Sequence, residues 1–234
     1  DFQSNGLSYG KVLRSPHAHA RIKSIDTSRA EKLPGVRAVV TSADLPPSNG
    51  NVTMKRRRNN VLAGDKVLYA GHAVAAVAAT SLHIAEEAME LIKVDYEVLP
   101  WVLTAPDAMM DDAPLIHDDL TTRSLGESTD KRSNIANYNQ YMLGDVEKGF
   151  AEADIIVERE THTKAVHQGY IEPHSATVDW HASGQVTIWC SSQGQFQVRE
   201  QSALILGISV SKILVVPLEI GGGFGGKETQ SFIF

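Results

Sequence analysis

A glycine-rich segment near the end of the chain constrains the fold more than any other feature. Residues 221–228 read Gly-Gly-Gly-Phe-Gly-Gly-Lys-Glu, and they follow an apolar stretch, 213–220, that is typical of a β-strand. Glycine has no Cβ, so such a segment exposes its backbone amides and lets a ligand approach closely. The sequence therefore predicts a strand that leads into a loop able to bind a ligand.

Three ordinary explanations of this segment compete with a specialised one. A phosphate-binding P-loop needs Ser or Thr after the lysine, where Glu228 would repel phosphate, so that explanation fails. A dinucleotide-binding fingerprint fits the spacing of Gly221, Gly223 and Gly226, but Pro217 suits a central parallel strand badly. A simple tight turn would need fewer glycines. The fingerprint and the turn remain as weaker alternatives.

The amino-acid composition limits the classes of protein to which the chain can belong. The chain has 234 residues, is 42% hydrophobic and has a formal net charge of −6, which excludes disorder and allows one or two domains. Because 28 acidic residues outnumber 22 basic ones, nucleic-acid binding is not expected. The one basic run, Lys55–Arg58, is interpreted as a solvated surface loop.

Cysteine and apolar runs exclude further classes. Cys190 is the single cysteine, so the chain cannot form an internal disulfide, a four-cysteine iron–sulfur cluster or a cysteine-based zinc site. A redox metal would have to arrive in a prebuilt cofactor or lie on another chain. The longest apolar run, 73–79, is too short to cross a bilayer, and no export signal is evident. We expect no membrane association and a cytoplasmic location.

Local patterns predict an α+β fold in two units. Ser81 is a plausible N-cap for the clearest helix, 82–93. The division expected is a first domain over 1–103, a surface-wrapping linker without regular structure over 104–143, and a second, partial domain over 144–234. The strands expected are 9–13, 20–26, 35–41, 67–80, 94–98, 155–163, 176–180, 185–191 and 213–220. The other helices expected are a short one capped by Asp145 and ending at Glu152, and one over 195–206 stopped by Gly207.

Five further motifs precede the glycine loop in order along the chain, at 13–20, 69–77, 94–100, 144–146 and 171–174. Together with the glycine loop they resemble one family, the molybdenum hydroxylases that include xanthine dehydrogenase and aldehyde oxidase. Residues 221–228 resemble the glycine loop of that family. Residues 13–20, 69–77 and 94–100 are similar to parts of its hammerhead domain, and 144–146 and 171–174 to the entry of its molybdopterin-binding domain. The resemblance implies a hammerhead α/β domain followed by the first segment of a mixed α+β molybdopterin-binding domain.

The resemblance also implies site residues. In this family a pterin dithiolene holds the metal, so no side chain of this chain is expected as a direct ligand. Gln193 resembles the glutamine that hydrogen bonds an oxo ligand of molybdenum, although without the family spacing it would be interpreted as a polar residue at a strand end. Gly222, Gly223, Phe224 and Gly225 resemble the loop residues that lie against the pterin, with Gln193 and Phe224 near molybdenum.

Two sets of residues remain open. Glu228 resembles the carboxylate that binds heteroaromatic substrates, but it could equally form an ion pair near Lys227 or face solvent. His17, His19, His162, His167 and His174 show no recognised metal-ligand spacing, so structural or surface roles are favoured.

The activity that the resemblance implies is oxidation of a purine, an N-heterocycle or an aldehyde with water as the oxygen source. The cofactor would be molybdenum–molybdopterin, with the cytosine dinucleotide form as one option, and iron–sulfur clusters and FAD would lie on partner chains or domains. The catalytic glutamate base is expected beyond Phe234, in a remaining C-terminal molybdopterin-binding segment, so the chain alone should be inactive. The alternative is a folded, non-catalytic assembly module without cofactor.

Overall fold

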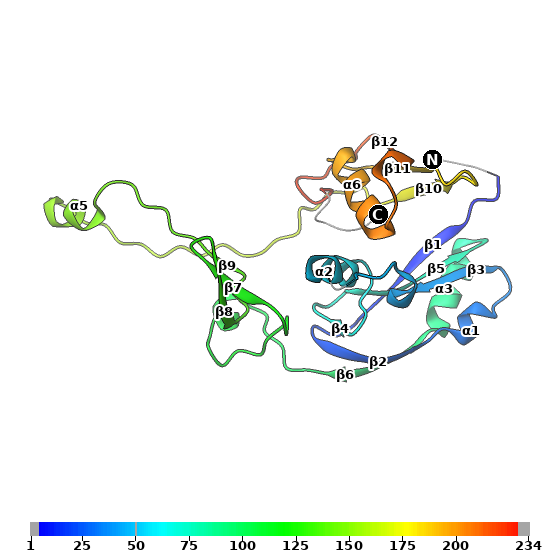
Figure 1. The fold of residues 1–234 in the computed structure, drawn as a ribbon, viewed down its shortest axis with the longest axis horizontal. Helices are drawn as coiled ribbons and strands as arrows, with labels where there is room; N and C mark the ends of the chain where they lie inside the picture. The colour runs from blue at the N-terminus through cyan, green and yellow to red at the C-terminus, as the bar shows by residue number, and fades with distance from the viewer. Residues whose placement is uncertain (1–4, 50, 229–234) are drawn as a thin grey trace. The chain divides into compact units, whose positions relative to one another are not determined.

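The computed structural model describes residues 5–49 and 51–228. The chain divides into two compact units. One unit contains Asp1–Leu99 together with His167–Phe234, and the other contains Pro100–Val166. Separate antiparallel and mixed sheets with helices packed beside them confirm the expected α+β class (Figure 1).

The first sheet is built around one buried strand. Its order is β1 (Tyr9–Arg14), β5 (Ala73–Ala79) and β3 (Val36–Thr41), with both outer strands antiparallel to β5. The strand expected over 67–80 is shorter than predicted, because 68–72 form a turn and only Ala73–Ala79 continue as β5. Four β5 side chains are at most 2% exposed, which confirms that this part is a buried strand: Val74, Ala75, Val77 and Ala79.

Helix α3 (Leu82–Leu91) packs against β1 and β5 and near the short helix α1 (Ser28–Glu31). The Ser81 hydroxyl accepts a hydrogen bond from the Ile84 amide at 3.2 Å, which satisfies one of the amides that a helix start leaves without a partner. The predicted helix and its cap are therefore confirmed, and Ala85 and Ala88 form its buried face.

The second sheet has the order β4 (Lys66–Val67), β2 (Ala20–Asp26) and β6 (Lys93–Val98), all antiparallel. In the turn between β4 and β5, the His72 side chain is completely buried. Its Nδ1 accepts from the Leu68 amide at 3.1 Å, so Nε2–H donates to the Asn59 carbonyl at 2.7 Å. Acceptance at Nδ1 requires the neutral ring, because both ring nitrogens of a protonated histidine are donors.

The basic run is helical, and the expectation of a solvated loop is wrong. Helix α2 (Val52–Val61) begins at the N-cap Asn51, whose side chain accepts from the Met54 amide. Arg58 donates to the carbonyls of Ser42 and Leu45, at the two ends of the 3-10 helix η1 (Ser42–Asp44). Short charge runs usually lie on the surface, but the Arg58 guanidinium has backbone partners that only the fold brings close.

The unit Pro100–Val166 carries its own small sheet, where no regular structure was expected. β7 (Thr121–Ser124) lies between β8 (Glu127–Arg132) and β9 (Asn137–Tyr138). Helix α4 (Ala105–Ala108) precedes the sheet, and α5 (Val146–Glu152) follows it with Asp145 as its N-cap, as predicted.

The strand predicted over residues 155–163 does not form. The structure assigns no strand to this stretch, and Ile155, Ile156 and Val157 are 59–81% exposed. A strand needs a hydrogen-bonding neighbour, and the described part of the chain offers none at this place. β-Branched composition alone was therefore a misleading signal.

The fourth sheet holds the last part of the described chain. β10 (Ala176–Trp180) and β11 (Val186–Cys190) form the predicted hairpin, and β12 (Ile213–Pro217) pairs parallel to β11. Helix α6 (Gln195–Leu206) ends at Gly207 in the left-handed region, as predicted, and is followed by η2 (Val210–Lys212). Val198 and Ala203 of α6 pack on the buried face of β11 and β12.

Helix α6 also touches α2 within the same unit, where Arg57 Nη1 donates to Gln201 Oε1 at 3.0 Å. Among the described residues, no helix is both long and apolar enough to span a bilayer.

Candidate functional site

The glycine loop follows β12 and closes into a tight turn. The Gly226 amide donates to the Gly223 carbonyl at 2.7 Å. Gly222 and Gly225 have φ values of 90° and 86°, which L side chains rarely adopt, and Phe224 itself has φ of 51°. The Phe224 ring is 74% exposed, so the turn presents a large aromatic side chain to solvent rather than burying it.

Gln193 is joined to this loop by its backbone and by its side chain. It follows β11 and the buried Ser191 and Ser192. The Gln193 amide donates to the Lys227 carbonyl at 3.0 Å, and its Oε1 accepts from the amides of Gly225 at 3.0 Å and Lys227 at 3.3 Å. Gln193 therefore contacts Gly225 and Lys227, which lie 32 and 34 residues further along the chain.

These hydrogen bonds determine which end of the Gln193 carboxamide is presented outward. Because Oε1 receives two N–H groups, the other end is the Nε2 amino group, which can only donate. Within 5–49 and 51–228, no partner is found for Nε2, and the Gln193 side chain is exposed. The arrangement thus offers a neutral, oriented hydrogen-bond donor at the edge of the glycine loop.

Gly223 and Gly226 are among the loop glycines that close contacts require. A Cβ on Gly223 would lie 2.5 Å from Gln193 Oε1, and a Cβ on Gly226 would lie 2.4 Å from Cε1 of Tyr170. A Cβ on Gly225, in contrast, would have no atom within 4 Å. The first two positions pack the loop onto the protein, and the third faces open space.

The backbone amides of the glycine loop fall into two groups, those with a hydrogen-bond acceptor in the described structure and those without one. Those of Gly221, Gly225, Gly226 and Lys227 donate within the protein. The part of the chain that the structure describes provides no acceptor for the amides of Gly222, Gly223 and Phe224. Backbone donors are rigid, so these three can bind an anionic or carbonyl-rich ligand at low reorganisation cost.

Beneath the loop lies a cluster that the sequence analysis did not assign. The Lys227 side chain is completely buried, and its Nζ contacts Glu172 Oε2 and lies 5.2 Å from the centroid of the Tyr170 ring. Hydrogen bonds from Lys227 and from the Gly221 amide hold the pKa of Glu172 below its ordinary range. Tyr170 Oη is 2.5 Å from His174 Nε2, and burial, followed by the charge of Lys227, lowers the pKa of His174.

Gln193 and the loop residues predicted with it come together, whereas the histidines named above, all within the described ranges, belong to no group of three metal-ligating residues. Glu228 is exposed, and Lys227 pairs with Glu172 instead. His162 contacts Glu160 at 3.2 Å on an exposed segment, and His17 packs edge-on against Tyr96. No group of three or more metal-ligating His, Cys, Asp or Glu residues occurs in the described ranges.

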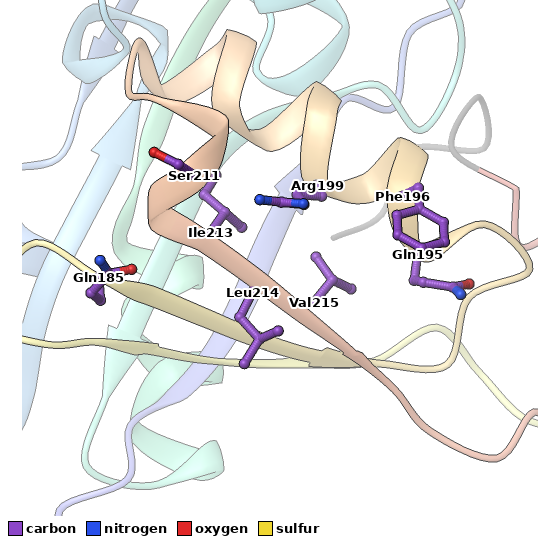
Figure 2. A pocket seen from close by; sticks show the side chains of 8 residues that line it. All are labelled: Gln185, Gln195, Phe196, Arg199, Ser211, Ile213, Leu214 and Val215. Carbon is purple, nitrogen blue, oxygen red and sulfur yellow. The ribbon is translucent and has the colours of Figure 1, made fainter.

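A separate shallow hollow of about 250 Å³ lies between α6 and β12. Figure 2 shows its lining, with Phe196 and Arg199 from α6 and Leu214 and Val215 from β12. Arg199 Nε donates to the Val210 carbonyl at 3.0 Å. Neither Gln193 nor the glycine loop lines this hollow, so it is distinct from the candidate site.

Comparisons with known proteins identify the family of each part of the chain. Residues 1–100 match the family described as "Aldehyde oxidase and xanthine dehydrogenase, a/b hammerhead domain", and residues 128–234 match "Molybdopterin cofactor-binding domain". The chain is 37% identical over 233 residues to the carbon monoxide dehydrogenase large chain of Afipia carboxidovorans, covering 97% of this chain and 29% of that one.

Solved structures give the same relationship. A Cu,Mo-CO dehydrogenase superimposes with a TM-score of 0.78 at 33% identity, covering 97% of this chain and 29% of that chain. Quinoline 2-oxidoreductase from Pseudomonas putida 86 superimposes with a TM-score of 0.79 at 28% identity, covering 97% and 28%. The chain therefore spans under a third of the length of these relatives.

The two family matches lie in the same order as the two groups of motifs, and the relatives align over nearly all of this sequence. The chain belongs to the xanthine dehydrogenase and aldehyde oxidase family of molybdenum hydroxylases.

Proposed function

We propose that Gln193 and the glycine loop form part of the molybdopterin site of a molybdenum-dependent oxidoreductase. The observation that carries the proposal is the double acceptance at Gln193 Oε1, from Gly225 and Lys227, which directs the Nε2 donor outward. An amide donor can orient an oxygen ligand of a metal without adding charge or displacing that ligand.

The described residues fit such a group. A Cβ on Gly225 would have no atom within 4 Å, so the space beside this glycine is open to a ligand. The nearby amides of Gly222, Gly223 and Phe224 are donors for an anionic cofactor. A cofactor that brings its own sulfur ligands needs no cysteine or histidine from the protein. That requirement matches the single, buried Cys190.

The proposal assigns a role to each residue. Gln193, Gly222, Gly223, Phe224 and Gly225 would hold the cofactor, with Gln193 and Phe224 near molybdenum, and no side chain would ligate the metal. When bound, the group supplies a centre for oxidation of an electron-poor carbon with water as the oxygen source. Glu228, which is exposed, would contact substrate.

The finer features of the function are part of the same proposal. The substrate would be a purine, an N-heterocycle or an aldehyde, and electrons would leave through iron–sulfur clusters and FAD on partner chains or domains. The cofactor would take either the simple or the cytosine dinucleotide form, in a cytoplasmic protein. We divide the chain into domains 1–103 and 144–234, joined by 104–143. No general base is assigned to these residues, so the chain alone should not turn over substrate.

Elemental and pterin analysis tests the proposal. The protein purified from its native source with its bound partners should contain molybdenum together with a pterin that becomes fluorescent on oxidation. A Gln193→Ala variant prepared identically should show an altered molybdenum electron paramagnetic resonance signal. Absence of both molybdenum and pterin from the native protein would reject the proposal in favour of a non-catalytic assembly module.

A further inference from the structure

The buried ammonium of Lys227 is the least expected group near the candidate site. Its side chain is 0% exposed, whereas the Glu172 side chain that it contacts is 33% exposed. Lysine is almost never fully buried unless it is paired, because its charge loses hydration. Tyr170 adds a second favourable contact, since its ring lies 5.2 Å from Lys227 Nζ.

One oxygen of Glu172 holds two distant points of the glycine loop. Glu172 Oε2 contacts Lys227 Nζ near the end of the loop and accepts from the Gly221 amide, at its start, at 2.7 Å. A Cβ on Gly221 would lie 2.7 Å from the Glu172 Cβ, so the backbone approaches this side chain as closely as glycine allows. The Glu172 carboxylate therefore holds the start and the end of the glycine loop together.

The backbone of Lys227 carries this restraint to Gln193. The Lys227 amide donates to Gln193 Oε1 at 3.3 Å, and the Lys227 carbonyl accepts from the Gln193 amide at 3.0 Å and from the Ser192 hydroxyl at 3.4 Å. Displacement of the Lys227 side chain would therefore shift the Lys227 amide, one of the two that orient the Gln193 carboxamide, together with the Lys227 carbonyl that holds the Gln193 backbone.

We propose that Glu172 and Lys227 are positioning residues. They hold the glycine loop, and through it the Gln193 donor, in the position that cofactor binding requires. Neither residue needs to touch the cofactor itself. This inference rests on the proposed function for its consequence at the metal, but the loop restraint itself depends only on the contacts above.

Glu172→Gln, Lys227→Met and the double variant test the proposal in the natively purified protein. Glu172→Gln keeps an acceptor for Gly221 but removes the charge, which leaves Lys227 buried without a counter-ion. The double variant removes both charges, so it should recover the stability that either single variant loses. It serves as the folded reference if a single variant does not accumulate.

Three readouts are measured on each variant: the urea midpoint of unfolding, hydrogen exchange of peptides covering 221–227, and the molybdenum paramagnetic signal. In the double variant we expect a midpoint near wild type, loop exchange faster by about tenfold, and a changed signal. The matched control is the exposed pair Lys11–Glu86, 2.9 Å apart, whose double variant Lys11→Met and Glu86→Gln should leave all three readouts unchanged.

The outcomes separate the two proposals. Wild-type loop exchange in the double variant, with molybdenum present in the wild-type protein, would overturn the positioning role and leave the proposed function standing. Faster loop exchange in a protein that holds no molybdenum would support the restraint and reject the proposed function. A change of midpoint alone, without change in loop exchange or signal, would show a purely structural ion pair.

Discussion

The side-chain oxygen of Gln193 lies 3.0 Å from the amide nitrogen of Gly225 and accepts its proton. This bond joins the segment after β11 to the loop after β12, two parallel neighbours in one sheet. Parallel strands place their carboxyl ends at the same edge, so the two segments begin side by side. The contact then decides which end of the carboxamide remains available to a ligand.

Substitution of Gln193 should separate loop restraint from ligand donation. Gln193→Glu keeps an acceptor oxygen for the Gly225 and Lys227 amides, so hydrogen exchange of peptides covering 225–227 should stay near wild type. Gln193→Ala removes the acceptor, and exchange there should rise by about tenfold. Both variants lose the Nε2 donor and should alter the molybdenum paramagnetic signal. Equal exchange in the two variants would contradict the assigned hydrogen bonds.

Gly226→Ala should displace the loop. Its Cβ would lie 2.4 Å from Tyr170 Cε1 and 3.0 Å from the Gly223 carbonyl oxygen. Overpacking of this kind costs about 1–3 kcal/mol in the free energy of unfolding, measurable by urea denaturation. Gly10→Ala is the control, because its nearest neighbour atom would be 3.9 Å away. Comparable losses in the two variants would argue against a close fit at Gly226.

His72 should make stability depend on pH. Burial lowers the pKa of His72 from its ordinary value of 6.5, so below pH 6.5 the unfolded chain binds a proton that the folded chain does not. The free energy of unfolding should therefore decrease as pH falls below 6.5, by up to about 1.4 kcal/mol per pH unit, and this contribution should be constant above it.

Urea denaturation between pH 5 and pH 8 measures this effect. His72→Gln should flatten the dependence, although His174, whose pKa is also lowered, would retain a part of it. The exposed His83 provides the control, and His83→Gln should keep the wild-type slope. A slope that survives unchanged in His72→Gln would exclude His72 as its source.

Ser81→Ala should destabilise the unit that contains α3. The variant removes the hydroxyl that accepts from the Ile84 amide at 3.2 Å, and loss of such a cap costs about 1 kcal/mol. The change should appear as a lower urea midpoint with an unchanged slope. Ser24→Ala, at an exposed position of β2, is the matched control. A stability loss no larger than that of the control would mean that the cap contributes little.

Elements with a local signal were predictable. Ser81 before α3, Gly207 after α6 and the turn at Gly184 each act through the conformation of a few neighbouring residues. Elements that depend on distant partners were not. The helix α2 was missed because the carbonyls that Arg58 contacts belong to another segment, and residues 155–163 were assigned as a strand without a neighbour to pair with.

By itself, the sequence determined the α+β class, the glycine loop after a strand and the family to which the chain belongs. These follow from residue order and local backbone preference, which act along the chain. Only the tertiary structure decided that Glu172 holds Gly221 and Lys227 together and that Gln193 turns its amino group outward. Hydrogen bonds and buried charge pairs depend on distances between segments far apart in sequence, and folding alone sets those distances.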